Sequence, residues 1–502
     1  MNGAMSGLFA AGLILLALAA VAGPFQRFTG AWPYLLGAAG SACLAVLGGF
    51  ALAGRSVQLD VAGWLGDPVP GQQAAALGAD RLSGLFLALS FGAALPVSVA
   101  FASWARRQGA RPGRLGASYA LALGAVAVIV TARDAFTALF GWETLTVAFY
   151  LLAGAERTRR DRAGAAQITF AFAKVSGAAL LFGLLLLATR SHSILLASFA
   201  HVPGGAARTT AEVLLLGGFA VKAGLVPFQV WLPRGYAAAP GPARAIMAGV
   251  CVNVAFYGMW RTFALIGRAP GWLTGGLLVL GALSALLGIA HAAVQNRLSR
   301  VIAYSSVENT GLIVTGFGVA LTGAAVGDRR LVAAGLLAAT LQVVTHTVAK
   351  SLLFTSSAGI EAATGADDLE ELRGRARRTP WSGFGLAVGS LTLAGLPPTV
   401  GFVSEWFLLE SLMQQFRVPG LGYRLVLALA GAAVALTAGF AGVTFVRRGP
   451  TTASLISPAS GSSASPSSAA SLTSTSGPLR SPGQRQWPSP GTPQGAGRRA
   501  GR

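Results

Sequence analysis

Three lysines lie deep inside apolar stretches of this 502-residue sequence: Lys174, Lys222 and Lys350. Every other basic side chain of the Lys and Arg class is an arginine. Arginine keeps its charge in proteins, whereas a buried lysine can accept and release a proton. A charged amine at the centre of a membrane helix costs roughly 2.5–3.5 kcal/mol on insertion scales and marks an ion or proton path. An amine that reaches the membrane surface is the alternative, but Lys222 and Lys350 have many apolar neighbours on both sides.

Carboxylates and a histidine occur in the same kind of surroundings. Glu143, Glu308 and Glu405 each interrupt an apolar run. His346 precedes Lys350 by four residues, which places both on one face of a helix. Together with the lysines, these side chains could pass protons through a membrane from one group to the next.

Two of the candidates have a second interpretation. Glu308, with Asn309 beside it, could form a polar contact between helices instead of carrying protons. His291, in the run GIAHAAVQ, could be a packed core histidine, and we favour that reading over a relay. Both remain possible members of a proton path, as does Lys174.

Prolines follow or precede two of the ionisable residues. Lys222 is followed by Pro227 and Pro233, and Pro397 and Pro398 precede Glu405. Proline removes a backbone donor and clashes with the preceding turn, so both helices should be broken. Paired, interrupted apolar segments in two halves of a chain indicate an inverted-repeat transporter. We therefore expect helices 1–3 in residues 1–114, a first five-helix repeat in 115–270 and a second in 271–446.

The composition requires a membrane. Hydrophobic residues make up 53% of the chain and charged residues only 11%, against about 25% charged residues in soluble proteins. Apolar runs long enough to span a bilayer recur from end to end, so the fold class is all-α integral membrane with about 13–14 transmembrane helices. The thirteen runs are about 6–23, 31–54, 81–104, 115–132, 134–154, 164–189, 211–230, 243–266, 272–294, 298–322, 331–358, 382–412 and 424–446.

The net charge of +21 reflects membrane topology and not nucleic-acid binding. The arginines lie between spans and form no continuous basic face, and alternate loops differ in their arginine content. The positive-inside rule then places the N-terminus outside the plasma membrane and the C-terminus in the cytoplasm. Residues 447–502 are rich in Ser, Pro, Gly and Arg, which predicts a disordered tail.

No cofactor or metal site is expected in this chain. Its two cysteines, Cys43 and Cys251, lie in separate apolar segments, and its four histidines form no HExxH motif. No phosphate-binding loop of the Walker or Rossmann type is present either.

Four segments in order resemble a known family: VKAGLVPFQVWLPRGYAAAPGPARAIMAGV, LSRVIAYSSVENTGLI, THTVAKSLLF and LAGLPPTVGFVSEWFLLESL. They are similar to the antiporter-like proton-pumping membrane subunits of respiratory complex I (NADH-quinone oxidoreductase). The likeness is closest to the large membrane subunit of hydrogenase-4 and formate hydrogenlyase, with Mrp antiporter subunits next. It covers roughly residues 80–446.

The resemblance implies two inverted five-helix repeats, each with one broken helix, and a midplane chain of ionisable side chains joined by water. The matching positions are Glu143, Lys222, His346, Lys350 and Glu405. In the family the counterparts of Glu143 and Lys222 form an ion pair whose opening gates proton transfer. Redox cofactors and electron transfer would belong to partner subunits, with protons, or alternatively Na⁺, as the transported ion.

The sequence also departs from the family. Asn253 stands where relatives carry a lysine or histidine, and it cannot take up a proton at neutral pH, although water could pass it. Lys174 lies near a position where relatives often have histidine and could compensate. Two alternatives to a redox-driven proton pump therefore remain open: a cation/proton antiporter subunit of Mrp type, and a membrane scaffold that does not conduct.

Overall fold

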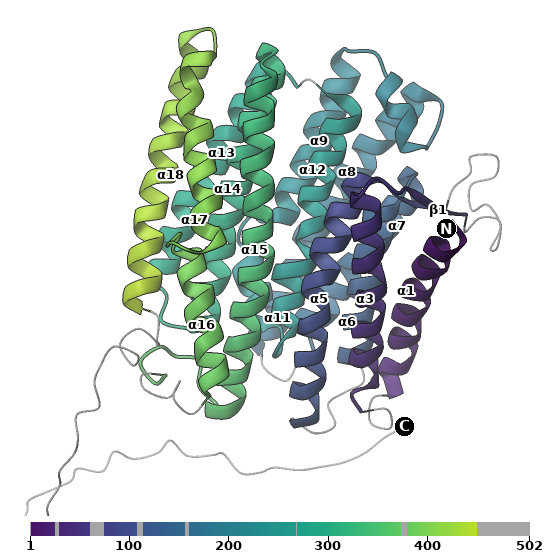
Figure 1. Ribbon diagram of the computed structural model, residues 1–502, viewed down its shortest axis with the longest axis vertical. Helices are drawn as coiled ribbons and strands as arrows, with labels where there is room; N and C mark the ends of the chain where they lie inside the picture. Colours follow the sequence, from purple (N-terminus) through teal and green to yellow (C-terminus); the bar gives the residue numbers. More distant parts are fainter. Residues whose placement is uncertain are drawn as a thin grey trace, which may run out of the picture. The chain divides into compact units, whose positions relative to one another are not determined.

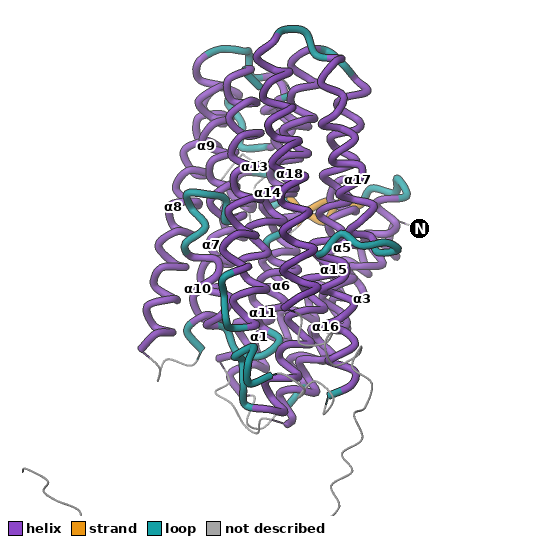
Figure 2. Tube along the Cα trace, turned by 90° about the vertical axis from the view of Figure 1, so that its left-hand side faces the viewer, coloured by secondary structure: helices purple, strands orange, loops and turns teal. Residues whose placement is uncertain are grey.

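The computed structural model describes residues 2–25, 30–60, 75–107, 114–155, 160–267, 269–372 and 379–448. The predicted tail beyond residue 448 lies outside the described residues. Long helices lie side by side and run roughly along one common direction (Figures 1 and 2). The α-helices are α1 (Asn2–Ala22), α3 (Trp32–Leu52), α5 (Arg81–Arg107), α6 (Arg114–Thr131), α7 (Ala135–Ala153), α8 (Arg160–Ser191), α9 (Ala206–Ala223), α10 (Trp231–Ala238), α11 (Ala243–Ala245), α12 (Asn253–Ile266), α13 (Gly271–Ala293), α14 (Leu298–Val326), α15 (Arg329–Thr364), α16 (Pro380–Leu393), α17 (Val400–Met413) and α18 (Leu421–Arg448).

Short elements complete the described part of the chain. The 3₁₀ helices are η1 (Gly23–Phe25), η2 (Leu196–His201) and η5 (Gln414–Arg417), and η3 (Ile246–Cys251) is a π-helix between α11 and α12. Strands β1 (Val57–Asp60) and β2 (Ala76–Ala79) pair antiparallel, with Val57 opposite Ala79.

The described helices confirm an all-α integral membrane fold. Eleven of them are long and apolar enough to cross a membrane, and all eleven coincide with predicted spans. The other two predicted spans, 211–230 and 382–412, are interrupted: the first is replaced by α9, a loop and α10, and the second by α16, a loop and α17.

Both interruptions have the same local cause. α9 ends at Gly224 (φ +73°), and α16 is followed by Gly395 (φ +61°), so each helix stops at a left-handed position that glycine adopts without a Cβ clash. Pro227 and Pro397 follow within three residues and cannot continue a helix. The second half-helices then pack in matching ways, α10 against α8 and α17 against α15.

Burial differs strongly among the spans. Within the most apolar 18-residue stretch of each span, 83% of the residues are buried in α14 and 78% in the α11–η3–α12 span. The corresponding share is 28% in α1 and in α18. α13 and α14 approach backbone to backbone, since a Cβ on Gly288 would lie 2.3 Å from the backbone nitrogen of Glu308. This close approach places Glu308 in the interior.

A charged cluster ties α5 to α12 and to the α6–α7 connection at one end of the helices. Arg261 donates two hydrogen bonds to the Asp80 carboxylate, at 2.7 and 2.8 Å, and Arg133 donates a third at 3.1 Å. Burial would raise the pKa of Asp80, but the Arg261 bonds and charge, the Ser83 backbone N–H and the Arg133 charge together hold that pKa well below its usual range. Asp80 therefore stays ionised and fixes this end of the three elements.

Candidate functional site

Lys222 lies in the last turn of α9, directly before the first helix break. Its side chain is buried, and its Nζ has no hydrogen-bond partner among the described residues. Nζ lies 4.0 Å from the ring centroid of Phe149 and 5.7 Å from that of Trp142, both on α7. Aromatic faces attract a cation, but they cannot exchange a proton with it. The two rings therefore hold the amine in place, and its hydrogen bonds are free for a side chain or water that moves next to it.

The predicted pair between Glu143 and Lys222 is not formed in this structure. Glu143 of α7 instead forms an ion pair with Lys174 of α8. A Cβ on Gly177, one turn further along α8, would lie 2.3 Å from Glu143 Oε1, so the glycine provides the room in which the carboxylate lies. The side chains of Glu143 and Lys174 are 40% and 50% exposed, whereas Lys222 is enclosed. Glu143 thus faces outward, although it remains within electrostatic range of Lys222.

His346 and Lys350 lie on one face of α15, as predicted from their spacing, and both are buried. His346 Nε2 lies 3.1 Å from the backbone oxygen of Ala248, and Nδ1 has no partner in the described part of the chain. Ala248 belongs to the π-helix η3, where the usual helix bonding pattern is altered. The Lys350 amine donates to Ser305 Oγ at 2.5 Å and to the Ile302 backbone oxygen at 3.2 Å, both on α14.

Asn253 begins α12 and links three helices. Its Nδ2 donates to Ser90 Oγ of α5 at 3.1 Å and to Thr347 Oγ1 of α15 at 3.0 Å. The Gly249 backbone oxygen in η3 lies 3.2 Å from the same nitrogen, so three acceptors share the two N–H bonds of the amide. Asn253 is fully buried, so these bonds satisfy a group that would otherwise be costly there. Asn253 thus bonds to Thr347, the residue that directly follows His346 on α15.

Glu308 and Glu405 approach the Lys350 region from α14 and α17. Glu308 is fully buried, and neither carboxylate oxygen has a hydrogen-bond partner among the residues described. It lies within electrostatic range of both Lys350 and Glu405. Gly395 at the second helix break makes room for Glu405, since a Cβ there would lie 2.3 Å from Oε2. The second helix break therefore lies next to a carboxylate, Glu405, as the first helix break lies next to a lysine, Lys222.

Uncharged polar side chains line the contact of α14, α15 and α17. Gln342 Nε2 donates to Asn309 Oδ1 at 3.0 Å, and Thr345 Oγ1 and Ser404 Oγ lie 3.0 Å apart. The sequence analysis missed Gln342, Thr345 and Ser404 as site residues. Gln342 in the run AATLQVV was the available signal, because an amide in an apolar span needs a partner.

His291 lies apart from these groups. It is exposed near the end of α13, its Nδ1 is 2.7 Å from the Leu287 backbone oxygen, and its ring stacks on Tyr304 at 5.4 Å. The structure therefore gathers His346, Lys350, Glu308 and Glu405 in the second half and leaves His291 at the edge.

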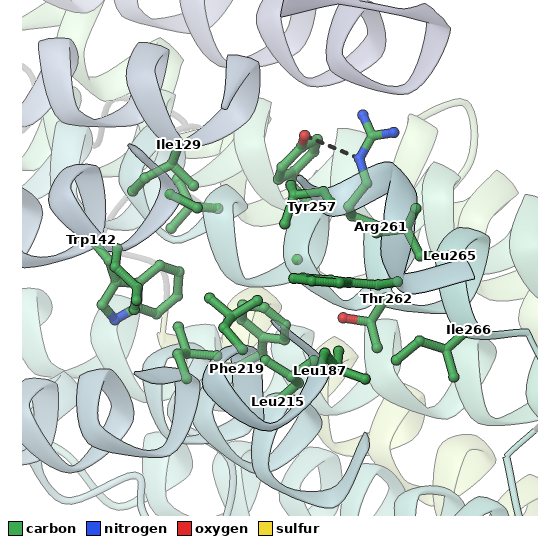
Figure 3. A pocket seen from close by; sticks show the side chains of 18 residues that line it. Ile129, Trp142, Leu187, Leu215, Phe219, Tyr257, Arg261, Thr262, Leu265 and Ile266 are labelled. Atoms are coloured by element: carbon green, nitrogen blue, oxygen red, sulfur yellow. Dashed lines mark hydrogen bonds between the residues drawn. The ribbon is translucent and has the colours of Figure 1, made fainter. Parts of the chain in front are cut away.

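An apolar cavity of about 70 Å³ lies beside the Lys222 region (Figure 3). It extends from Trp142 to Arg261, whose Nε donates to the Tyr257 hydroxyl at 3.1 Å. Nearly all of its lining is apolar, and cavities of that kind stay dry. Its lining thus includes Trp142, which contacts Lys222, and Arg261, which bonds to Asp80.

Within the described ranges, no group of three or more His, Cys, Asp or Glu side chains is arranged to hold a metal ion. The ionisable side chains are instead distributed along the interior, next to two broken helices. Such an arrangement suits transfer between neighbouring groups and not ligation of one ion.

Residues 132–422 match the family described as NADH:quinone oxidoreductase/Mrp antiporter, transmembrane. This chain belongs to that family. An uncharacterized protein of Mycobacterium tuberculosis is 37% identical over 336 residues, which cover 66% of this chain and 52% of that protein. Hydrogenase-4 component B of Escherichia coli is 33% identical over 316 residues, which cover 62% of this chain and 47% of that protein.

The fold of this antiporter-family chain also recurs in a solved structure, that of the membrane-bound sulfane sulfur reductase, an archaeal respiratory membrane complex. The TM-score is 0.70 at 19% identity, and 87% of each chain is covered. The chain spans about half the length of the curated relatives named above. The family and the fold are thereby established, and both agree with the resemblance seen in the four sequence motifs.

Proposed function

We propose that this antiporter-family chain translocates protons across the plasma membrane as a subunit of a complex I-like or hydrogenase-4-like redox complex. The observation that carries the proposal is the set of buried ionisable groups beside the two helix breaks. Lys222 and Glu308 have buried charged-group atoms without hydrogen-bond partners in the described chain. Such groups are costly in a membrane and are retained where protons pass.

The first half would work as a switch at Glu143. An ion pair at ~4 Å and an effective dielectric of ~20 is worth about 4 kcal/mol. When Glu143 turns inward to Lys222, the pair would hold a proton on the amine. When Glu143 turns outward to Lys174, as in this structure, Lys222 loses that stabilisation and can pass its proton on. A short side-chain movement then decides whether Lys222 keeps its proton.

The second half would carry the proton from Lys350 towards Glu405. Lys350, His346 and Glu308 lie close together on α14 and α15, and Glu308 lies within electrostatic range of Glu405. Buried polar atoms without protein partners are the usual sites of internal water. Water at Glu308 and at His346 Nδ1 would link these groups into a continuous path.

Asn253 would support this path without accepting a proton. Its bonds to α5 and α15 hold the π-helix η3 next to His346. An amide can orient a water molecule, so the proton can pass beside Asn253 along water. This assigns Asn253 a positioning role where relatives carry a protonatable side chain.

Partner subunits would supply the chemistry that drives transport. The match to hydrogenase-4 component B and the family description both support a redox complex, whose cofactors would lie outside this chain. The N-terminus would face outward and the C-terminus the cytoplasm. The family description also includes Mrp antiporters, so Na⁺/proton exchange is the second candidate.

Inverted membrane vesicles that contain the native complex provide the test. NADH, reduced ferredoxin and formate are added in turn, and a pH-sensitive dye reports acidification of the vesicle interior. We expect acidification with one donor, insensitive to Na⁺ and abolished by an uncoupler. Na⁺-dependent proton movement without any donor would favour an antiporter, and no proton movement in the intact complex would favour a scaffold.

A further inference from the structure

Arg244 ties the segment after the first helix break to α15. The residue lies on the short helix α11, between α10 and the π-helix η3, and it is buried. Its Nη1 donates to the Glu361 carboxylate of α15 at 2.7 Å, and its Nε donates to the Ala239 backbone oxygen at 2.8 Å. Ala239 directly follows the last residue of α10. One guanidinium therefore joins the end of α10 and the start of α11 to a helix 117 residues further along the chain.

Stability alone is a weak reason for this ion pair. The Arg244 side chain is only 3% exposed and that of Glu361 is 32% exposed, so the guanidinium has lost nearly all of its contact with the surroundings of the protein. Replacing a buried ion pair by well-packed apolar side chains is often neutral or stabilising. The better-attested use of such a pair is to fix the register of two elements. The pair is thus suited to hold α10 and α15 in one arrangement.

Trp231, the first residue of α10, lies against the groups that hold Lys222. Its Nε1 donates to the backbone oxygen of Val221, which directly precedes Lys222. Its ring centroid lies 6.1 Å from that of Phe149, and the Lys222 amine lies 4.0 Å from the same Phe149 centroid. All these side chains are buried, and protein interiors are packed too densely for one to move without its neighbours. A change at Lys222 therefore acts on the start of α10.

Tyr236, further along α10, lies against the second group of ionisable side chains. Its ring centroid lies 6.0 Å from that of Phe354 on α15, one helical turn beyond Lys350. Its hydroxyl donates to the Met247 backbone oxygen of η3 at 3.4 Å, and η3 also contacts His346. The half-helix α10 thus contacts the surroundings of the first path residue at its start and those of the second group through Tyr236.

We propose that Arg244 and Glu361 are positioning residues whose ion pair fastens α10 to α15 and thereby couples the two halves of the proton path. The inference rests on the proton transfer proposed for Lys222. With the pair intact, a shift of α10 that begins at Lys222 also displaces α15, which carries His346 and Lys350. Without the pair, α10 can shift while α15 keeps its place, and the two halves no longer act together.

The number of protons moved per electron pair provides the first test, with donor oxidation followed in the same inverted vesicles. Arg244→Gln removes the ion pair at its buried end. Glu361→Gln removes it at its partly exposed end, where substitution is better tolerated. Arg234→Gln is the matched control, because Arg234 is exposed on the same half-helix. Arg244→Glu combined with Glu361→Arg restores a pair of opposite charges.

Both single variants should oxidise the donor at the wild-type rate and move at least about fivefold fewer protons per electron pair, the low end of typical couplings between two sites. Arg234→Gln should match the wild type, and the charge exchange should recover the ratio. An unchanged ratio in the assembled single variants would overturn the proposal. A parallel loss of donor oxidation and proton movement would also overturn it, because a merely structural ion pair gives that result.

Hydrogen exchange separates this inference from the proposed function. Lys222→Met should change the amide exchange of residues 346–354 on α15 in the otherwise wild-type complex. The same substitution should leave that exchange unchanged when Arg244→Gln is also present. Equal changes in both backgrounds would overturn the coupling. If wild-type vesicles move no protons but the two backgrounds differ in this way, the proposed function fails and the coupling stands.

Discussion

Glu143 pairs with Lys174 at the exposed side of α7 and α8, while the buried amine of Lys222 lies over the Phe149 ring without a hydrogen-bond partner in the described chain. One carboxylate thus has two lysines within electrostatic range, one outward and one inward. Lys174 therefore competes with Lys222 for the Glu143 carboxylate.

Lys174→Met should shift Glu143 towards Lys222 and slow proton release from it. The pair lies on two membrane spans and not in bulk water, so its loss should cost at least about 1 kcal/mol, which corresponds to an at least fivefold slower pumping rate. Lys174→Arg retains the positive charge and should stay near the wild-type rate. Initial rates of vesicle acidification at equal assembly measure both. Identical rates for Lys174→Met and Lys174→Arg would refute the competition.

Glu308→Gln tests the relay between Lys350 and Glu405. The amide is isosteric but cannot carry a proton, so pumping should fall by about 100-fold while the complex still assembles. Thr310→Val is the matched control on α14, because the Thr310 hydroxyl donates to the Val307 backbone oxygen of the same helix. Normal pumping in Glu308→Gln would mean that Glu308 is a helix contact.

Asn253→Ala should destabilise the fold more than it slows transport. It removes bonds to Ser90 and Thr347 and leaves buried hydroxyls without that partner, at a cost of about 1–3 kcal/mol. Thr347→Val should cause a similar loss, and the double variant should cost less than the sum, because both changes break one network. Thermal unfolding of the purified complex measures this. Additive losses would contradict a shared network.

Asp80→Asn tests the charged cluster at the ends of α5 and α12. The folded-state pKa of Asp80 lies below its usual range, so the carboxylate contributes stability that is fully present above about pH 4 and is lost as the pH falls further. The melting temperatures of wild type and Asp80→Asn should therefore differ by a constant amount from pH 8 to about pH 5 and converge only in stronger acid. Convergence already near neutral pH would show that the pKa is not lowered.

The sequence predicted the spans and both helix breaks because hydrophobicity and proline act locally. It also predicted that Lys222, His346 and Lys350 lie inside the protein, and all three are buried. It could not predict the partner of Glu143, which depends on the space that Gly177 leaves between α7 and α8.

The π-helix η3 and the Thr345–Ser404 contact were equally out of reach of the sequence analysis. No residue type specifies a π-turn, and a threonine–serine contact between α15 and α17 depends on how two distant segments pack. The π-helix contacts His346, and Ser404 precedes Glu405, so these neighbours of the candidate path could be identified only from the tertiary structure.

The most direct test of the account is the pH gradient generated by vesicles with Lys222→Ala at equal assembly, compared with wild type and with Ser176→Ala. Ser176 lies on α8 and bonds the Gly218 backbone oxygen of α9, so its variant alters the same helix contact without removing an ionisable group. Lys222→Ala should abolish the gradient, and Ser176→Ala should keep it. An unchanged gradient in an assembled Lys222→Ala complex would contradict the account.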